Sequence, residues 1–172
     1  MAARPPVVEG GTGPRVQIRA AVMADAPQVA SLLLESFIEY RDLYTPEGFA
    51  ATTPTSEEVL TRMEEGPVWV ALLDGSVVGT VAAVERGEDL YVRGMAVLPA
   101  ARGLGIGELL LREVEGHAAA LGYGRLLLST TPFLHRAIRL YERFGFRRSE
   151  EGARALKGTP LFTMVKSLVR AR

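Results

Sequence analysis

The sequence contains no cysteine, and this absence excludes several kinds of chemistry. The chain has no disulfide framework, no zinc–thiolate site and no cysteine nucleophile that could carry a covalent intermediate. We therefore expect no metal and no covalent intermediate on the protein.

The chain also lacks an excess of charge of either sign. Its 20 Lys and Arg residues balance its 20 Asp and Glu residues. We therefore expect neither nucleic acid nor an anionic membrane as a partner, and any anion has to be bound locally. No apolar run reaches the roughly 20 residues that cross a bilayer, and the N-terminus has no signal-peptide core, so we expect a cytoplasmic protein.

The N-terminus lacks any periodic pattern. Residues 1–15 mix Pro, Gly and Ala, and we expect them to form a disordered tail. The remaining residues, 16–172, suit a single domain with one hydrophobic core and a small-molecule cleft.

Hydrophobic periodicity in this domain predicts an α/β fold, in which helices cover a mixed sheet. Strands are expected at residues 16–19, 68–73, 76–84, 90–98, 126–128, 146–148 and 161–168. Helices are expected from an Asp25 N-cap to about Arg41, from Thr55, over 106–121 and over 133–144, and a loop is expected over 42–54. Thr55 and Glu58 have the spacing of a capping box.

The most informative segment joins a predicted strand to a predicted helix. It reads Arg102-Gly103-Leu104-Gly105-Ile106-Gly107. Such a turn leaves N–H groups unpaired at a helix N-terminus, where the helix dipole favours an anion and glycine lets phosphate oxygens approach the backbone. Taken alone, the segment fits either a phosphate site or a turn that starts a helix tightly against a strand.

This segment does not match the motifs of two other phosphate-binding loops. The dinucleotide fingerprint G-x-G-x-x-G requires glycine where the chain has Glu108 or Leu110, depending on where counting starts. The nucleoside-triphosphate P-loop requires Gly-Lys-Ser/Thr, and both lysines, Lys157 and Lys166, lie far along the sequence.

The pattern R-x-x-G-x-G over residues 102–107, preceded by residues 95–97 and Pro99, resembles the acetyl-coenzyme A loop of the GNAT superfamily of N-acetyltransferases. Residues 137–146 are similar to the later helix-and-strand motif of that superfamily. With the element order, the resemblance covers residues 16–168. It implies a twisted, mostly antiparallel sheet of about seven strands with a splayed parallel pair, flanked by about four helices.

The resemblance also implies acetyl-coenzyme A as cosubstrate. The backbone at Met95, Ala96 and Val97 would bond to the pantetheine arm between the splayed strands, which leave N–H and C=O groups free. The pyrophosphate would be held at Arg102, Gly103, Leu104, Gly105, Ile106 and Gly107.

The implied reaction transfers an acetyl group directly to a primary amine of a small molecule or peptide, and the departing thiolate needs a proton. Tyr141 is the proton donor by resemblance, although its spacing with Ala137 and Ile138 also fits a core tyrosine. Glu88 and Asp89 are candidate bases acting through water, and they fit exposed turn carboxylates as well.

The chain departs from the family pattern at two positions. Leu134 replaces an Asn that contacts the cofactor arm in many members, and Tyr91 replaces a Glu of the fourth strand. Candidates to replace the Asn contact are Ser129, Thr130, Thr131 and His135. These departures keep a second function open, that of a non-catalytic acyl-coenzyme A sensor or interaction domain.

Aromatic residues are the candidates for acceptor binding, and packing within the domain is the other explanation for several of them. The candidate positions are Phe37, Tyr40, Tyr44 and Tyr91, and Phe49 of the expected loop is a further aromatic candidate. They favour a small or partly apolar amine. A homodimer is left open.

Overall fold

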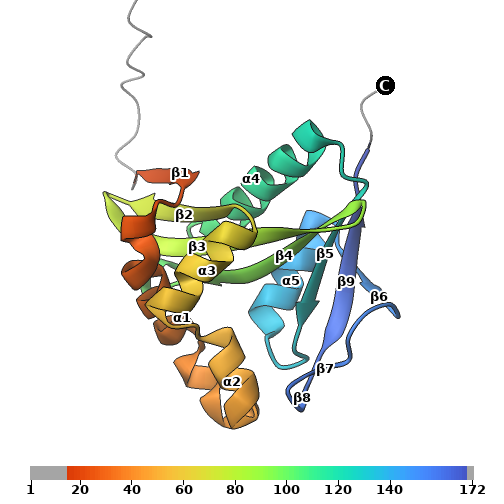
Figure 1. Ribbon diagram of the computed structural model, residues 1–172, viewed down its shortest axis with the longest axis horizontal. Coiled ribbons are helices and arrows are strands. Elements are labelled where there is room, and N and C mark those ends of the chain that lie inside the picture. The colour runs from red at the N-terminus through yellow and green to blue at the C-terminus, as the bar shows by residue number, and fades with distance from the viewer. Residues whose placement is uncertain (1–14, 170–172) are drawn as a thin grey trace, which may run out of the picture.

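A computed structural model describes residues 15–169 of the chain (Figure 1). The tail expected over residues 1–15 therefore lies outside the described residues, apart from Arg15. No helix within residues 15–169 is long and apolar enough to span a membrane.

Seven strands form one sheet in the order β1-β2-β3-β4-β5-β9-β6. Their bounds are β1 Val16–Ala20, β2 Val68–Leu73, β3 Ser76–Arg86, β4 Asp89–Val97, β5 Arg125–Thr130, β6 Arg147–Ser149 and β9 Phe162–Ser167. The helices are α1 Ala26–Phe37, α2 Pro46–Thr52, α3 Ser56–Glu65, α4 Ile106–Leu121 and α5 His135–Phe144, with 3-10 turns η1 Met23–Asp25, η2 Ile38–Leu43 and η3 Pro99–Ala101. The predicted α/β fold with a mixed sheet is confirmed.

The parallel pair of the sheet is β4 with β5, and it is short. The two strands pair only from Asp89 and Arg125 to Val92 and Leu128. Beyond this point β4 continues to pair with β3, and β5 continues to pair with β9, but not with each other. The two central strands therefore separate, as the resemblance to the GNAT superfamily implied.

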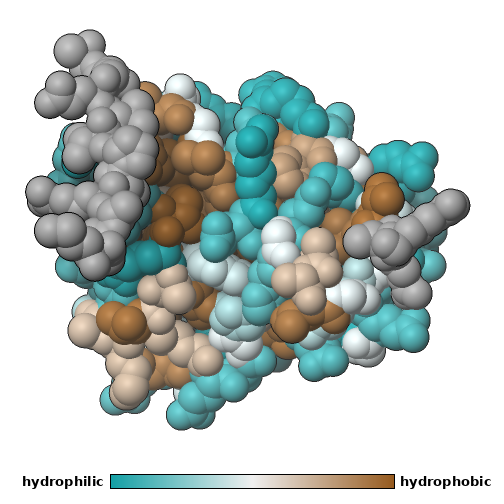
Figure 2. Space-filling model, turned by 90° about the horizontal axis from the view of Figure 1, so that it is seen from above, coloured by the Kyte–Doolittle hydropathy of each residue, from teal (hydrophilic) through white to brown (hydrophobic). Residues whose placement is uncertain are grey.

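Helices cover both faces of this sheet (Figure 1). α4 and α5 pack on one face around buried residues such as Leu110, Val114 and Phe146. α1 and α3 pack on the other face around Val29, Leu33 and Val59. The outer surface is mixed, and Figure 2 shows hydrophilic residues interspersed with smaller apolar areas on the face seen from above.

The N-terminal helix differs from the prediction at both ends. Asp25 occupies the N-cap position, but its carboxylate accepts hydrogen bonds from Arg19 at 2.7 and 3.0 Å and from the Val22 amide at 2.8 Å instead of capping α1. The α-helix ends at Phe37 and not near Arg41. The chain continues as the 3-10 turn η2, which buries no side chain and so lacks an apolar stripe that would hold an α-helix to the core.

The expected loop over residues 42–54 contains the helix α2. Its start signal was present in the sequence, because Pro46 takes the first helical position and the Thr45 hydroxyl accepts the Gly48 N–H at 3.0 Å. The Thr45 amide also donates to the Thr159 hydroxyl at 2.9 Å. This bond ties α2 to a small hairpin, β7 (Ala155–Leu156) and β8 (Thr159–Pro160), that the sequence did not predict.

The capping box of α3 is confirmed and gives a first test of the fold. The Thr55 hydroxyl accepts the Glu58 N–H at 3.2 Å, and the Glu58 carboxylate accepts the Thr55 N–H at 3.2 Å. We expect Thr55→Ala to lower the free energy of unfolding by about 1 kcal/mol. Chemical denaturation measures this change. Thr61→Ala, in the middle of the same helix, is the control, and an equal loss in both variants would contradict a capping role.

Candidate active site

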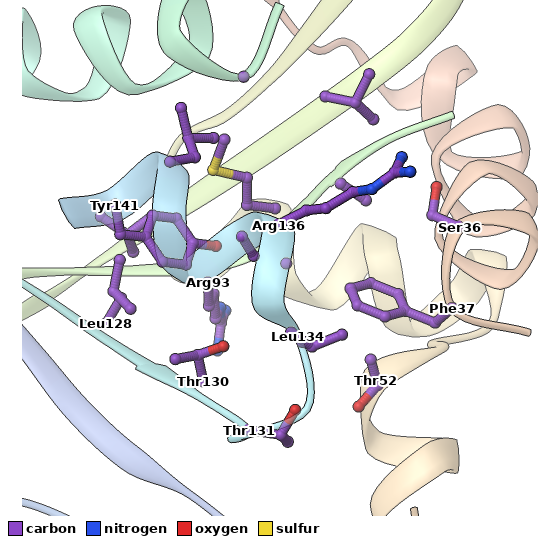
Figure 3. Close-up of a pocket in the computed structure, with 18 of the residues that line it drawn as sticks. Ser36, Phe37, Thr52, Arg93, Leu128, Thr130, Thr131, Leu134, Arg136 and Tyr141 are labelled. Carbon is purple, nitrogen blue, oxygen red and sulfur yellow. The ribbon is translucent and has the colours of Figure 1, made fainter. Parts of the chain in front are cut away.

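A cavity of about 760 Å³ lies where β4 and β5 separate. Its lining includes Gly105 and Ala137 from the α4–α5 face of the sheet, and Phe37 and Arg62 from the α1–α3 face. Residues 91–97 of β4 and 128–130 of β5 line it as well. The cavity therefore reaches through the sheet and joins its two faces (Figure 3).

The glycine loop forms the wall of this cavity at the start of α4. Gly103 and Gly105 have left-handed backbones, with φ of +84° and +76°, and a Cβ added at either would meet no atom within 4 Å. Open space therefore lies directly in front of the loop. The amides from Gly103 to Glu108 donate to no other group within residues 15–169, and they sit at a helix N-terminus. Unpaired amides facing open space fit an anionic group such as a diphosphate.

The other predicted cofactor positions also reach the cavity, with one exception. Met95, Ala96, Val97, Arg102, Ile106 and Gly107 line it. Leu104 does not, and its side chain is 45% exposed at the outer side of the loop. Arg102 forms an ion pair with Glu39 of η2 at 2.9 Å. The β4 backbone beside the gap is not paired with β5, so it is free to bond to a ligand that carries amides.

Tyr141 lies on α5, and its hydroxyl is directed into the cavity (Figure 3). The residue is only 8% exposed, and its ring packs edge-on against Phe146 at 5.9 Å. Burial raises the pKa of the phenol far above its usual value, and the nearby Tyr44 and Tyr91 raise it further. The hydroxyl therefore carries its proton at neutral pH and well above it.

Glu88 and Asp89 lie apart from Tyr141 and from the cavity lining. Glu88 is in the exposed turn before β4. The Asp89 carboxylate accepts two hydrogen bonds from Arg125, at 3.1 and 2.9 Å, across the paired part of β4 and β5. Among the described residues, Glu108 contributes the one carboxylate of the cavity lining.

Phe49 does not line the cavity, but the other four aromatic candidates for acceptor binding do. They are Phe37, Tyr40, Tyr44 and Tyr91. Phe133 supports two of them, with ring centroids 4.9 Å from Tyr44 and 6.2 Å from Tyr40. Phe133 precedes α5, which begins at His135 and two residues later than predicted.

The structure also brings to the cavity polar residues that the sequence analysis did not select, among them Ser36, Arg62, Arg93 and Arg136. Arg93 could have been identified from the sequence, because strand alternation places it on the same side of the predicted strand as Tyr91. No sequence pattern pointed to Arg62, because α3 meets β4 only in the folded chain. Of the candidates to replace the missing Asn contact, Ser129, Thr130 and Thr131 line the cavity together with Leu134, whereas His135 does not.

A model of the acetyltransferase (GNAT) family matches residues 31–146, which is well over half of the chain. The chain belongs to the GNAT family. The match includes the glycine loop, Tyr141 and all of the cavity lining except Leu156 and Leu161. The uncharacterized N-acetyltransferase YjgM of Escherichia coli (strain K12) is 32% identical over 136 residues, which cover 75% of this chain and 80% of YjgM.

A shorter match links the GNAT chain to larger proteins. The N-acetylaspartate synthetase of Homo sapiens is 44% identical over 81 residues, 46% of this chain and 27% of that protein. The corresponding protein of Danio rerio is 44% identical over 85 residues, 48% of this chain and 30% of that protein. The chain thus matches less than a third of the length of these synthetases.

Solved structures share the fold of this GNAT chain. The PaiA N-acetyltransferase of Thermoplasma acidophilum, solved with coenzyme A, has a TM-score of 0.77 at 17% identity over 90% of this chain and 99% of that one. YncA of Salmonella typhimurium, described as an acetyltransferase with its cofactor acetyl-CoA, has a TM-score of 0.68 at 20% identity over 91% and 95%.

Proposed function

We propose that the protein transfers an acetyl group from acetyl-coenzyme A to the primary amine of a small molecule or peptide, directly and within a ternary complex. The observation that carries this proposal is the cavity through the sheet, which joins the amides at the start of α4 to the hydroxyl of Tyr141. Donor and acceptor can enter from opposite faces and meet at the gap between β4 and β5.

The residues around the gap have distinct roles in this proposal. The amides of residues 103–107 bind the pyrophosphate, and the β4 backbone from Met95 to Val97 binds the pantetheine amides. Acetyl-coenzyme A supplies the activated thioester carbonyl. Tyr141, which is protonated at neutral pH, donates its proton to the sulfur as the thiolate leaves. The direct route is consistent with a chain that has no cysteine to hold the acetyl group.

Loss of a proton from the acceptor amine is assigned to water in the cavity. Asp89 is held by Arg125, and Glu88 lies in the exposed turn, so neither carboxylate is beside the gap. If either acts as a base, it does so through intervening water. The lining contributes Tyr91 at the position where the family pattern noted above has a Glu.

Steady-state kinetics test this function against the non-catalytic sensor. We expect release of free thiol from acetyl-coenzyme A to depend on added primary amine. Initial-velocity lines at several amine concentrations should intersect, as a ternary complex requires. Parallel lines would indicate a covalent acetyl-enzyme and would contradict direct transfer. Binding of acetyl-coenzyme A without thiol release, for every amine tried, would support the sensor.

A further inference from the structure

We propose that the acceptor is a small amino acid, and that Arg62 and Arg93 bind its carboxylate inside the cavity. This inference rests on the function proposed above and names the substrate class of the same site. The two arginines come from separate elements, α3 and β4, and both line the cavity.

The arginine pair lies on the face of the sheet opposite the glycine loop. Arg93 forms an ion pair with Glu65 of α3, which places its side chain on the α1–α3 face. Val92, the preceding strand residue, packs with Leu110 and Tyr141 on the other face. The pair is therefore separated by the sheet from the amides that suit a diphosphate. An anion bound by these arginines belongs to the acceptor and not to the cofactor.

The charge of this pair is incompletely neutralised within the protein. Arg62 donates to the Ala51 carbonyl at 2.9 Å and forms no ion pair with a carboxylate of residues 15–169. Burial lowers the pKa of Arg62 and the neighbouring Arg93 lowers it further, while the nearby Glu58 and Glu65 offset only part of this shift. Two like charges that are partly withdrawn from water favour an anionic ligand between them.

Unpartnered polar atoms in the lining of the same cavity also indicate a polar ligand. Arg93 Nε is buried and has no hydrogen-bond partner, although the other end of its guanidinium meets Glu65. Ser36 Oγ on α1 is likewise buried without a partner, in a residue that is 4% exposed. Both residues line the cavity (Figure 3). Buried polar groups of this kind are normally satisfied, so a ligand that accepts hydrogen bonds fits them.

The lining also disfavours a purely cationic acceptor. Its one carboxylate among the described residues, Glu108, lies on α4 and pairs with Arg112 at 2.9 Å. No carboxylate of the lining stands beside Arg62 and Arg93 to hold an ammonium group. Phe37 and Tyr40 offer apolar contact for the body of the acceptor. An amino acid satisfies this arrangement with its carboxylate at the arginines and its amine directed toward the gap.

Matched pairs of acceptors test the inference on the unmodified protein. We expect kcat/KM for free amino acids to exceed that for the same compounds with each carboxylate replaced by a carboxamide by on the order of 100-fold. Amino acids with one and with two carboxylates should both be included. Amines that lack any acid group should be poor acceptors.

Two variants then assign the preference to the arginines. Arg62→Met and Arg93→Met should each lower kcat/KM for amino acids by about 10- to 100-fold and leave that for carboxamides nearly unchanged. Coenzyme A affinity should stay the same and report that the variants fold. Arg154→Met, at a side chain that is 80% exposed, is the matched control and should change nothing.

The outcomes separate this inference from the proposed function. Equal use of acids and carboxamides, or equal losses on both in the two variants, would overturn the acceptor assignment while acetyl transfer stands. If no amine releases thiol, the proposed function fails. In that case, calorimetric titration of amino acids into the coenzyme A complex tests the carboxylate site independently of acetyl transfer. Binding that is lost in Arg62→Met would support the site, and absence of binding would overturn it.

Discussion

Gly105→Glu is expected to weaken acetyl-coenzyme A binding by about 100- to 1000-fold. The new side chain begins in the open space before the loop, where the structure places unpaired amides at the start of α4. Two like charges about 4 Å apart repel by roughly 4 kcal/mol at an effective dielectric constant of 20, so a carboxylate there opposes a pyrophosphate strongly. Calorimetric titration measures the loss.

A matched control exists at the other end of the same helix. Gly122 has φ +79°, close to the +76° of Gly105, and a Cβ added at either position meets no atom within 4 Å. Gly122→Glu therefore introduces the same side chain with about the same backbone strain, roughly 1–2 kcal/mol. We expect it to bind acetyl-coenzyme A normally. Similar affinity in a folded Gly105→Glu protein would refute the phosphate assignment.

Tyr141→Phe is expected to slow acetyl transfer by about 10²- to 10⁴-fold while acetyl-coenzyme A affinity and stability stay nearly intact. The substitution removes one hydroxyl and keeps the ring that packs against Phe146. Because the pKa of Tyr141 is raised, the wild-type rate should show no loss from ionisation of this group up to at least about pH 10. A pH–rate profile checks this expectation.

A structural tyrosine predicts a different result. If the hydroxyl served only the fold, its removal would lower the free energy of unfolding by roughly 1–3 kcal/mol and leave the rate unchanged. Tyr123→Phe is the control, because Tyr123 packs against the same core but does not line the cavity. Kinetics and denaturation measured together on both variants separate the two roles.

Local signals explain why much of the fold was predictable. Glycines at both ends of α4 and the capping box of α3 fix helix boundaries within a few residues of the chain, so sequence alone reveals them. The end of α1 was not predictable, because η2 follows from the absence of buried side chains over residues 38–43, and burial is a property of the whole fold. The hairpin of β7 and β8 depends on contacts with Thr45, which lies more than one hundred residues away in the sequence.

The candidate site likewise contains one part that the sequence predicts and one part that only the fold brings together. The glycine loop is continuous in the sequence, so its pattern alone predicts residues that line one wall of the cavity. The arginine pair is not continuous, because Arg62 and Arg93 meet only when α3 packs on β4. Asp89 shows the opposite case. Its position in the strand suggested a base, but the partner that occupies its carboxylate, Arg125, lies on the neighbouring strand.

The most direct test of the central claim is mass spectrometry of the acceptor after incubation with isotope-labelled acetyl-coenzyme A. We expect a free amino acid to gain one labelled acetyl group on its amine nitrogen, with one thiol released for each product, and Gly105→Glu to lose this activity at limiting cofactor. Thiol release without an acetylated amine would mean simple hydrolysis. That result, or no product from any primary amine while acetyl-coenzyme A still binds, would contradict the proposed acetyl transfer.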